Sequence, residues 1–309
     1  MAHFLLALKT VAPLFLVIFT GTLFSRTKAA HGPWVDVLNK YALWIGFPAL
    51  VVASLMHLDP QGESYTKLIL INSVYIATCM LLAFPIARIF KFSKRLRSSL
   101  FLILSFGNVA YLGIPVLRSS FGDDILPVAA VLSAVYVFWL LTLGVILIES
   151  TGEESIRPKK LMLSLVKNPL LISVFVGVTI VLFQIKVPTF IDKTVSLFAE
   201  SVTAIVLFSL GIFLGQNKIG VPREWIRVFG FVIVTMIILP LLLQFSIRTA
   251  GLNDLQFKAT ILDSAMPLGL TPYALAVQYK LETKLVARIV VLGTLLSVII
   301  IPLWIAFLG

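Results

Sequence analysis

Apolar segments of about twenty residues follow one another along almost the whole chain, and the charged residues collect in the short stretches between them. A helix needs about twenty residues to cross roughly 30 Å of hydrocarbon. Because these segments are continuous and do not alternate with polar residues, they are typical of membrane-spanning helices. We predict ten spans, at residues 4–24, 35–57, 67–90, 99–121, 125–148, 161–185, 190–213, 225–247, 256–279 and 283–308.

The predicted spans form two sets of five. A shift of 156 residues lays the spans of residues 1–148 over those of residues 161–309, with the polar stretch 149–160 between them as a linker. VAPLFLVIF (11–19) then overlays KNPLLISVF (167–175), and LGIP (112–115) overlays LGLT (268–271). Because five is odd, the second copy must lie upside down in the membrane. The sequence therefore predicts an all-α membrane protein made of two inverted five-helix repeats, an arrangement typical of secondary transporters.

The fourth and ninth spans carry helix-breaking residues near the middle of the bilayer. These are Gly107, Gly113 and Pro115 in one span, and Pro267, Gly269 and Pro272 in the other. Proline removes a backbone donor, and the freed groups must face protein or a wet cavity because they cannot face lipid. Breaks at equivalent places in two repeats indicate a binding site. The alternative, for any single proline, is a simple kink.

The start of a half-helix after such a break offers unpaired N–H groups and a positive dipole end, which attract an anion. We therefore expect the substrate to be a small organic anion, a carboxylate. The candidate binding residues all lie at or beside the two breaks: Gly107, Asn108, Tyr111, Gly113, Pro115, Ser264, Pro267, Thr271 and Pro272.

Two acids within predicted spans are candidates for ion coupling. Asp263 lies beside the break in the ninth span, and Glu200 lies in the middle of the seventh, where we expect it to be buried. An acid at the bilayer centre costs about 2.5–3.5 kcal/mol on insertion scales, so it should face a partner or a cavity. Either residue could carry a proton or ligate Na⁺ with its oxygens. The alternative is a fixed hydrogen bond or an ion pair with a lysine.

Composition excludes several other classes of protein. The chain is 59% hydrophobic and 13% charged, with a mean hydropathy of +1.04, which is unlike a soluble domain. Cys79 is the only cysteine, and the three histidines lack metal-binding spacing, so no cofactor is expected beyond H⁺ or Na⁺ as a coupling ion. The patterns of an intramembrane enzyme and the nucleotide-binding loop of an ATP-driven pump are both missing.

The basic residues predict an orientation in the membrane. Of the 25 Lys and Arg, 18 fall on one side of the ten spans and 6 on the other, with Lys9 inside the first span. The positive-inside rule places the richer side in the cytoplasm and both termini outside a cell membrane. The net charge of +11 thus reflects topology and contact with lipid, and no nucleic acid partner is expected. Trp34, Trp225 and Trp304, near span ends, are typical of interfacial anchors.

Three segments carry a family resemblance. GNVAYLGIPVLRSSFG (107–122) resembles the fourth-span signature of the auxin efflux carrier family, within the bile/arsenite/riboflavin transporter superfamily. VLFSLGIFLG (206–215) is similar to the end of the family's seventh span. AMPLGLTPYALAVQYKLETKLVARIVVLGTLLSVIIIPLW (265–304) is similar to its last two helices.

The resemblance implies a scaffold from spans 1, 2, 6 and 7 and a transport domain from spans 3–5 and 8–10. It also implies a substrate held where spans 4 and 9 cross, an elevator or rocking movement, and often a homodimer. Asn108 and Pro115 match the first crossover, and Pro267 and Pro272 match the second.

The chain departs from the plant members at two points. Plant carriers have a long insertion where this chain has only residues 149–160, so the compact form typical of bacteria and archaea is expected, and auxin is not the expected substrate. Asp263 stands where plant carriers have a neutral amide, which favours ion coupling. A sensor or channel-type facilitator with the same fold is the alternative function.

Overall fold

The computed structural model describes residues 2–30, 33–56, 64–151, 163, 166–216 and 222–308, and in these ranges the chain is helical, without strands. The helices of the first half are α1 (Ala2–Phe24), α2 (Trp34–Tyr41), α3 (Phe47–Leu55), α4 (Thr66–Ile89), α5 (Lys94–Ile103), α6 (Ile114–Phe121), α7 (Leu126–Trp139) and α8 (Val145–Thr151). Those of the second half are α10 (Pro169–Leu182), α11 (Thr189–Gln216), α12 (Pro222–Ile233), α13 (Leu239–Ile247), α14 (Asp254–Ser264), α15 (Leu270–Gln278) and α16 (Thr283–Leu308).

Seven helical stretches of the described chain are long and apolar enough to cross a membrane. They are Phe4–Phe24, Trp34–Leu55, Thr66–Ile89, Asp123–Ser150, Thr189–Gln216, Trp225–Ile247 and Thr283–Leu308, which coincide with predicted spans 1, 2, 3, 5, 7, 8 and 10. The remaining three predicted spans contain shorter helices. Spans 4 and 9 are interrupted, and the shorter apolar helix in span 6 is α10. Most of the predicted linker, from residue 152 to residue 160, lies outside the described residues.

Proline explains three local widenings of these helices. The π-turns Ala42–Gly46, Val109–Gly113 and Val234–Ile238 end two residues before Pro48, Pro115 and Pro240, respectively. A proline ring cannot donate to the carbonyl four residues earlier and clashes with it, and one wider turn relieves that clash. In all three places a helix continues past the proline, so proline changes the helical turn here without interrupting the helix.

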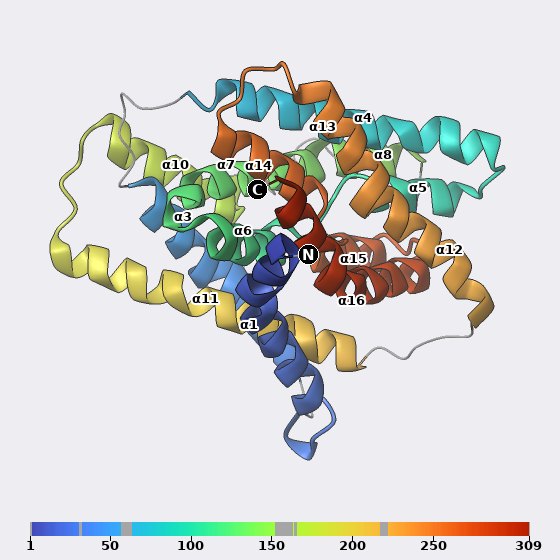
Figure 1. Cartoon of the computed structure of the whole chain (residues 1–309), viewed down its shortest axis with the longest axis horizontal. Coiled ribbons are helices and arrows are strands. Elements are labelled where there is room, and N and C mark those ends of the chain that lie inside the picture. Colours follow the sequence, from blue (N-terminus) through green and yellow to red (C-terminus); the bar gives the residue numbers. More distant parts are fainter. Residues whose placement is uncertain are drawn as a thin grey trace.

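The helices contact one another in two groups (Figure 1). In one group, α11 packs against α1, α2 and α3, and α3 packs against α10. In the other, α4 contacts α5 and α7, α12 and α15 contact α16, and α14 contacts α13 and α7. The groups touch where α1 meets α16 and α6, and where α7 meets α3 and α10. Segments from both halves of the chain take part in each group.

Glycine allows the closest of these approaches. The backbones of α1 and α11 are so close that a Cβ on Gly211 would collide with the Ile18 carbonyl and lie 2.9 Å from Gly21 Cα. The Thr22 hydroxyl donates to the Gly211 carbonyl at 3.0 Å, which ties the two helices together. Small residues at a helix crossing are typical of membrane proteins, because lipid supplies no hydrophobic force between helices.

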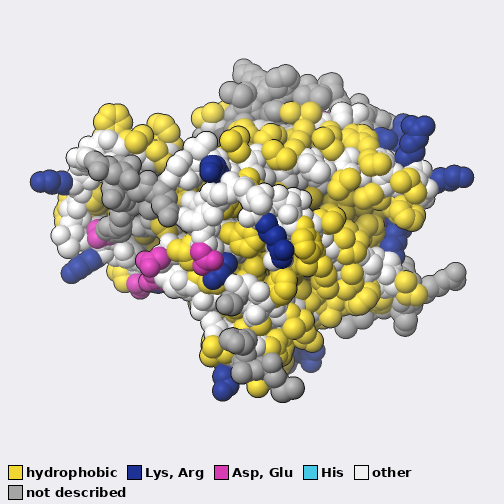
Figure 2. All heavy atoms as spheres, turned by 45° about the horizontal axis from the view of Figure 1, so that its top comes forward, with side chains coloured by type: hydrophobic (Ala, Val, Ile, Leu, Met, Phe, Trp, Pro, Cys, Tyr) yellow, Lys and Arg dark blue, Asp and Glu magenta, His cyan; other side chains and the backbone are white. Residues whose placement is uncertain are grey.

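The outer surface is rich in large apolar side chains (Figure 2). Phe175, Phe183, Leu197 and Ile226 are between 69% and 79% exposed, which would be costly in water. Such a surface is suited to contact with lipid. It is consistent with the long apolar helices, which have the length of membrane spans.

Candidate functional site

Two interrupted helices meet in the interior of the protein. Residues 104–108 separate α5 from the π-turn η3 (Val109–Gly113), and residues 265–269 separate α14 from α15. Gly107 and Leu268 form an antiparallel bridge, and the Asn108 N–H donates to the Pro267 carbonyl at 2.6 Å. The non-helical stretches therefore satisfy part of each other's backbone hydrogen bonding, as an interior away from water requires.

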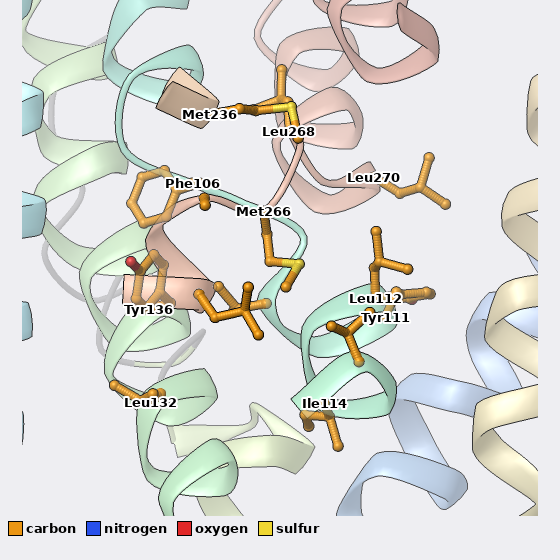
Figure 3. Close-up of a cluster of buried hydrophobic side chains, with 14 of the residues drawn as sticks. Phe106, Tyr111, Leu112, Ile114, Leu132, Tyr136, Met236, Met266, Leu268 and Leu270 are labelled. Atoms are coloured by element: carbon orange, nitrogen blue, oxygen red, sulfur yellow. The ribbon is translucent and has the colours of Figure 1, made fainter. Parts of the chain in front are cut away.

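The lack of a side chain at Gly107 lets the two stretches come this close. A Cβ there would lie 3.1 Å from both the Met266 Cβ and the Met266 carbonyl oxygen, and 3.3 Å from the Asp263 carbonyl oxygen. Figure 3 shows the surrounding apolar side chains, with Phe106 and Tyr136 on one side of Met266 and Tyr111 and Leu112 on the other. Apolar side chains therefore surround much of the junction.

The Asp263 carboxyl lies at this junction. Its side chain is 0% exposed, and neither oxygen has a hydrogen-bond partner among the described residues. A Cβ on Gly113 would lie only 2.6 Å from Asp263 Oδ1, so the carboxyl fills the space that this glycine leaves free. The carboxyl group of α14 is therefore in contact with the backbone of η3.

Asn108 also lies close to Gly113. Its backbone carbonyl accepts from the N–H groups of Leu112 at 3.1 Å and Gly113 at 2.8 Å, and this shared acceptance forms the π-turn. Its side chain is 3% exposed, and its Nδ2 has no hydrogen-bond partner among the described residues. The junction thus holds both an unpaired amide donor and an unpaired carboxyl group.

A small cavity opens beside the breaks, with a volume of about 10 Å³. That volume is about what a single water molecule occupies, so no organic anion fits. Its polar lining comes from Tyr75, Ser105, Tyr136, Thr235 and Ser264, and Gly107 also contributes. Of the predicted binding residues, only Gly107 and Ser264 line it.

Sequence reasoning missed the other polar residues of this cavity. Ser105 Oγ and Tyr136 Oη are buried and have no hydrogen-bond partner among the described residues. Tyr75 and Tyr136 lie inside long apolar spans, where a polar group needs a partner or a cavity. That feature of the sequence could have identified them.

The remaining predicted residues lie around the junction in different environments. Tyr111 packs its ring on Phe47 of α3, with 5.1 Å between ring centroids. Pro115 and Pro272 are buried in the first turns of α6 and α15, whereas Thr271 is exposed at the start of α15. The structure therefore brings together five residues at the junction, namely Gly107, Asn108, Gly113, Asp263 and Pro267. Tyr111 instead packs against α3, and Thr271 is exposed.

The expectation that Glu200 is buried is wrong. Its side chain is exposed on α11, on the same helix as the exposed Phe190 and Leu197. The cause is packing, because α1, α2 and α3 cover the opposite face of α11. In the part of the chain that the structure describes, no three His, Cys, Asp or Glu side chains gather where a metal ion could bind.

Trp304 also differs from the interfacial anchor that its position predicts. It is 5% exposed, and its indole N–H donates to the Met236 carbonyl at 2.9 Å. Met236 lies four residues before Pro240, which has no N–H to offer that carbonyl. The tryptophan of α16 therefore satisfies a backbone group that proline leaves free in the neighbouring helix.

A wider pocket, which the sequence did not predict, lies beside α15. It has a volume of about 280 Å³ and is lined by Trp225, Tyr273, Thr283, Lys284 and Arg288, among others. The pocket brings two cationic side chains to the helix that follows the second break. Its size is sufficient for a small organic molecule.

Long apolar helices around an interior junction of two interrupted helices define a multi-pass membrane protein. The chain belongs to the membrane transport protein family, whose model matches residues 6–305. This match confirms the resemblance to the auxin efflux carriers. The chain is therefore a membrane transporter, with a small-molecule substrate, rather than a member of an enzyme family.

Similar proteins from other organisms carry names that agree with this assignment. An uncharacterized transporter of Methanocaldococcus jannaschii is 24% identical over 301 residues, covering 94% of each chain. Auxin efflux carrier component 1 of Arabidopsis thaliana is 24% identical over 149 residues, which are 47% of this chain and 24% of that protein. A Rhizobium meliloti protein named "Putative malonate transporter" is 20% identical over 301 residues, covering 93% of this chain and 91% of the relative.

Proposed function

We propose that this protein is a secondary active transporter that carries a small organic anion, a carboxylate, by alternating access. The substrate binds at the junction of the two interrupted helices. The observation that carries the proposal is the fully buried, unpaired Asp263 carboxyl in contact with the η3 backbone, beside two breaks joined by the hydrogen bond from Asn108 to Pro267. Interrupted helices with unpaired polar groups are what a transporter needs at its binding site.

The proposal includes ten spans in two inverted repeats, residues 1–148 and 161–309. It assigns spans 1, 2, 6 and 7 to a scaffold and spans 3–5 and 8–10 to a transport domain. The packing of α11 against α1, α2 and α3, and of α3 against α10, supports the first group. The contacts of α4 with α7 and of α14 with α13 support the second. An elevator or rocking motion then moves one group past the other.

An anionic substrate follows from the helix ends at the junction. The first N–H groups of a helix have no intrahelical partner, and in η3 and α15 no capping side chain accepts from them. Such groups, together with the helix dipole, favour a carboxylate. Lys284 and Arg288 in the wider pocket beside α15 would attract the carboxylate from the side of the membrane that holds the basic loops. The malonate in the name of the Rhizobium relative belongs to the same chemical class.

Movement of the helices is a necessary part of the mechanism. The cavity at the breaks has a volume of about 10 Å³, whereas ligand sites usually occupy about 300–1,000 Å³. The groups that contact each other at the junction must therefore separate before a carboxylate can enter. Alternating access supplies this separation on one side of the membrane at a time.

Asp263 is the proposed coupling residue. A charged carboxylate without a partner is costly in an apolar interior, and an anionic substrate nearby would add repulsion. A proton or Na⁺ on the carboxyl removes both costs, so binding of the ion and binding of the substrate support each other. We leave Glu200 out of the coupling site because its side chain is exposed.

The proposed setting is a cell membrane, with both termini outside and the basic loops in the cytoplasm, and the proposed assembly is a homodimer. The orientation rests on the uneven distribution of Lys and Arg between the two sides. The assembly rests on the family resemblance alone.

The test is counterflow in liposomes that contain the purified protein. We expect saturable uptake of labelled malonate, or of another mono- or dicarboxylate, driven by unlabelled substrate inside and dependent on pH or Na⁺. Asp263→Asn should remove the ion dependence. Asp254→Asn is the matched control, because Asp254 lies on the same helix, is exposed and pairs with Lys258 at 2.8 Å.

Two results would count against the proposal. Non-saturable flux without counterflow would indicate a channel-type facilitator. Unchanged rate, pH dependence and Na⁺ dependence in Asp263→Asn would remove Asp263 from the coupling mechanism.

A further inference from the structure

An open groove lies at the turn between α4 and α5, away from the junction of interrupted helices. Its volume is about 630 Å³, and it is lined by the cations Arg88, Lys91, Lys94 and Arg97 and the aromatic residues Phe84 and Phe92, among others. The groove therefore combines a cationic rim with an apolar floor.

The positive charge of this groove is not neutralised by the described part of the protein. Residues 84–103 contain no Asp or Glu, and the described structure has no ion pair to the four rim cations. Arg97 Nε is buried and lacks a hydrogen-bond acceptor there, while its guanidinium carbon lies 5.7 Å from the centre of the Phe84 ring. A buried, unpaired guanidinium donor calls for an acceptor that the described residues do not supply.

A cation from the second half of the chain lies against Phe92, one of the aromatic residues of the groove. Arg227 of α12 places its guanidinium carbon 4.8 Å from the centre of the Phe92 ring. In Figure 2, Lys and Arg side chains gather at the right-hand edge, where Figure 1 places the turn between α4 and α5, and the acidic side chains visible on this face lie elsewhere. Cations from two distant parts of the sequence thus lie close to Phe92.

The position of the groove indicates what fills it. The α4 helix is a 24-residue apolar span, and the groove begins in its last two turns. That is the depth at which lipid headgroups meet the acyl chains. A phospholipid with a net negative headgroup offers phosphate oxygens to the rim and acyl chain to Phe84 and Phe92, and basic pockets at helix ends are known to hold such lipids.

We infer that the groove between α4 and α5 is a binding site for an anionic phospholipid. The rim cations bind the headgroup phosphate, the Arg97 guanidinium supplies the buried donor, and the aromatic floor receives the upper part of one acyl chain. Non-specific attraction of anionic lipid to the basic surface would require only positive charge. In that case, removing cations inside the groove and removing cations outside it would weaken lipid binding equally.

Native mass spectrometry of the full chain in detergent, titrated separately with phosphatidylglycerol and phosphatidylcholine, tests this site. We expect phosphatidylglycerol to bind at least about tenfold more tightly, since each cation near a headgroup contributes about a fivefold factor and the rim holds Arg88, Lys91, Lys94 and Arg97. Arg88→Gln/Lys94→Gln should weaken phosphatidylglycerol binding by about 25-fold. Both side chains are exposed, so the variant should keep its fold, and its thermal unfolding without added lipid checks this.

The control variant is Arg26→Gln/Arg95→Gln, which removes the same charge from exposed positions that do not line the groove. It should bind phosphatidylglycerol within about twofold of the unmodified protein. Equal weakening in both double variants would overturn the site, and so would equal binding of the two lipids. Displacement of phosphatidylglycerol by millimolar inorganic phosphate would show that the groove takes a free anion and would also overturn the lipid assignment.

Discussion

The contact between Gly113 and Asp263 can be tested directly by adding one methyl group. In Gly113→Ala the new Cβ would lie 2.6 Å from Asp263 Oδ1 and 3.4 Å from the Asn108 carbonyl oxygen. Ordinary contact begins at about 3.4 Å, so the carboxyl and the π-turn must move apart by about 0.8 Å. Asp263 is fully buried among packed helices, and the carboxyl has little room to turn.

The size of the effect follows from the cost of overpacking. Forcing an extra carbon into a packed interior typically costs about 1–3 kcal/mol. Alanine is intrinsically better than glycine in a helix by up to about 1 kcal/mol, which offsets part of this loss. We therefore expect a net loss of about 1–2 kcal/mol in the free energy of unfolding. Carboxylate counterflow should fall at least tenfold, because the junction is where we place the substrate.

A double-mutant cycle separates this contact from general damage. Asp263→Ala removes the oxygen that the new methyl group meets, so Gly113→Ala should cost about 1 kcal/mol less in that background. Gly230→Ala is the control for helix propensity, since no heavy atom lies within 4 Å of its added Cβ. Unfolding is measured thermally in detergent for all variants.

The geometry would be refuted by additive effects in the cycle. It would also be refuted if Gly113→Ala unfolded at the same temperature as Gly230→Ala. Either result would mean that the carboxyl does not occupy the space beside Gly113.

Three further predictions concern other parts of the fold. Trp304→Phe leaves the Met236 carbonyl without its donor, and we expect a loss of about 1–3 kcal/mol in the free energy of unfolding, seen as a lower melting temperature in detergent. Gly211→Leu places a branched side chain against the Ile18 carbonyl and should push α1 away from α11. We expect it to lower the melting temperature more than any single change above, and an unchanged melting temperature would contradict this. Lys284→Gln removes a cation from the pocket beside α15. The KM for a carboxylate should rise about two- to fivefold, and its dependence on salt should become weaker. An unchanged KM would exclude this pocket from the substrate route.

Several features of this protein could be read from the chain without coordinates. The length and continuity of the apolar segments predicted spans at 4–24 and 283–308, and the structure has span-length apolar helical stretches at Phe4–Phe24 and Thr283–Leu308. Glycine together with proline predicted interruptions in the fourth and ninth spans, and the helices end at Ile103 and Ser264. These features depend on local backbone chemistry and on the thickness of the bilayer, which the sequence alone encodes.

The role of each polar residue depended on packing. Asp263 and Glu200 look alike in sequence, since each is an acid within an apolar span, yet one is fully buried against Gly113 and the other is exposed on α11. Trp304, close to the end of its span, is buried and donates to Met236.

The physical reason lies in the solvent. In water, the apolar face of a helix identifies its buried side, but in a bilayer both the lipid and the protein interior are apolar, so hydrophobicity does not distinguish them. Which face of α11 is covered, and which backbone Asp263 meets, depend on how segments about 150 to 190 residues apart in the sequence pack against each other. Only the tertiary structure brings Asn108 to Pro267 and Gly113 to Asp263, because each partner lies in the opposite half of the chain.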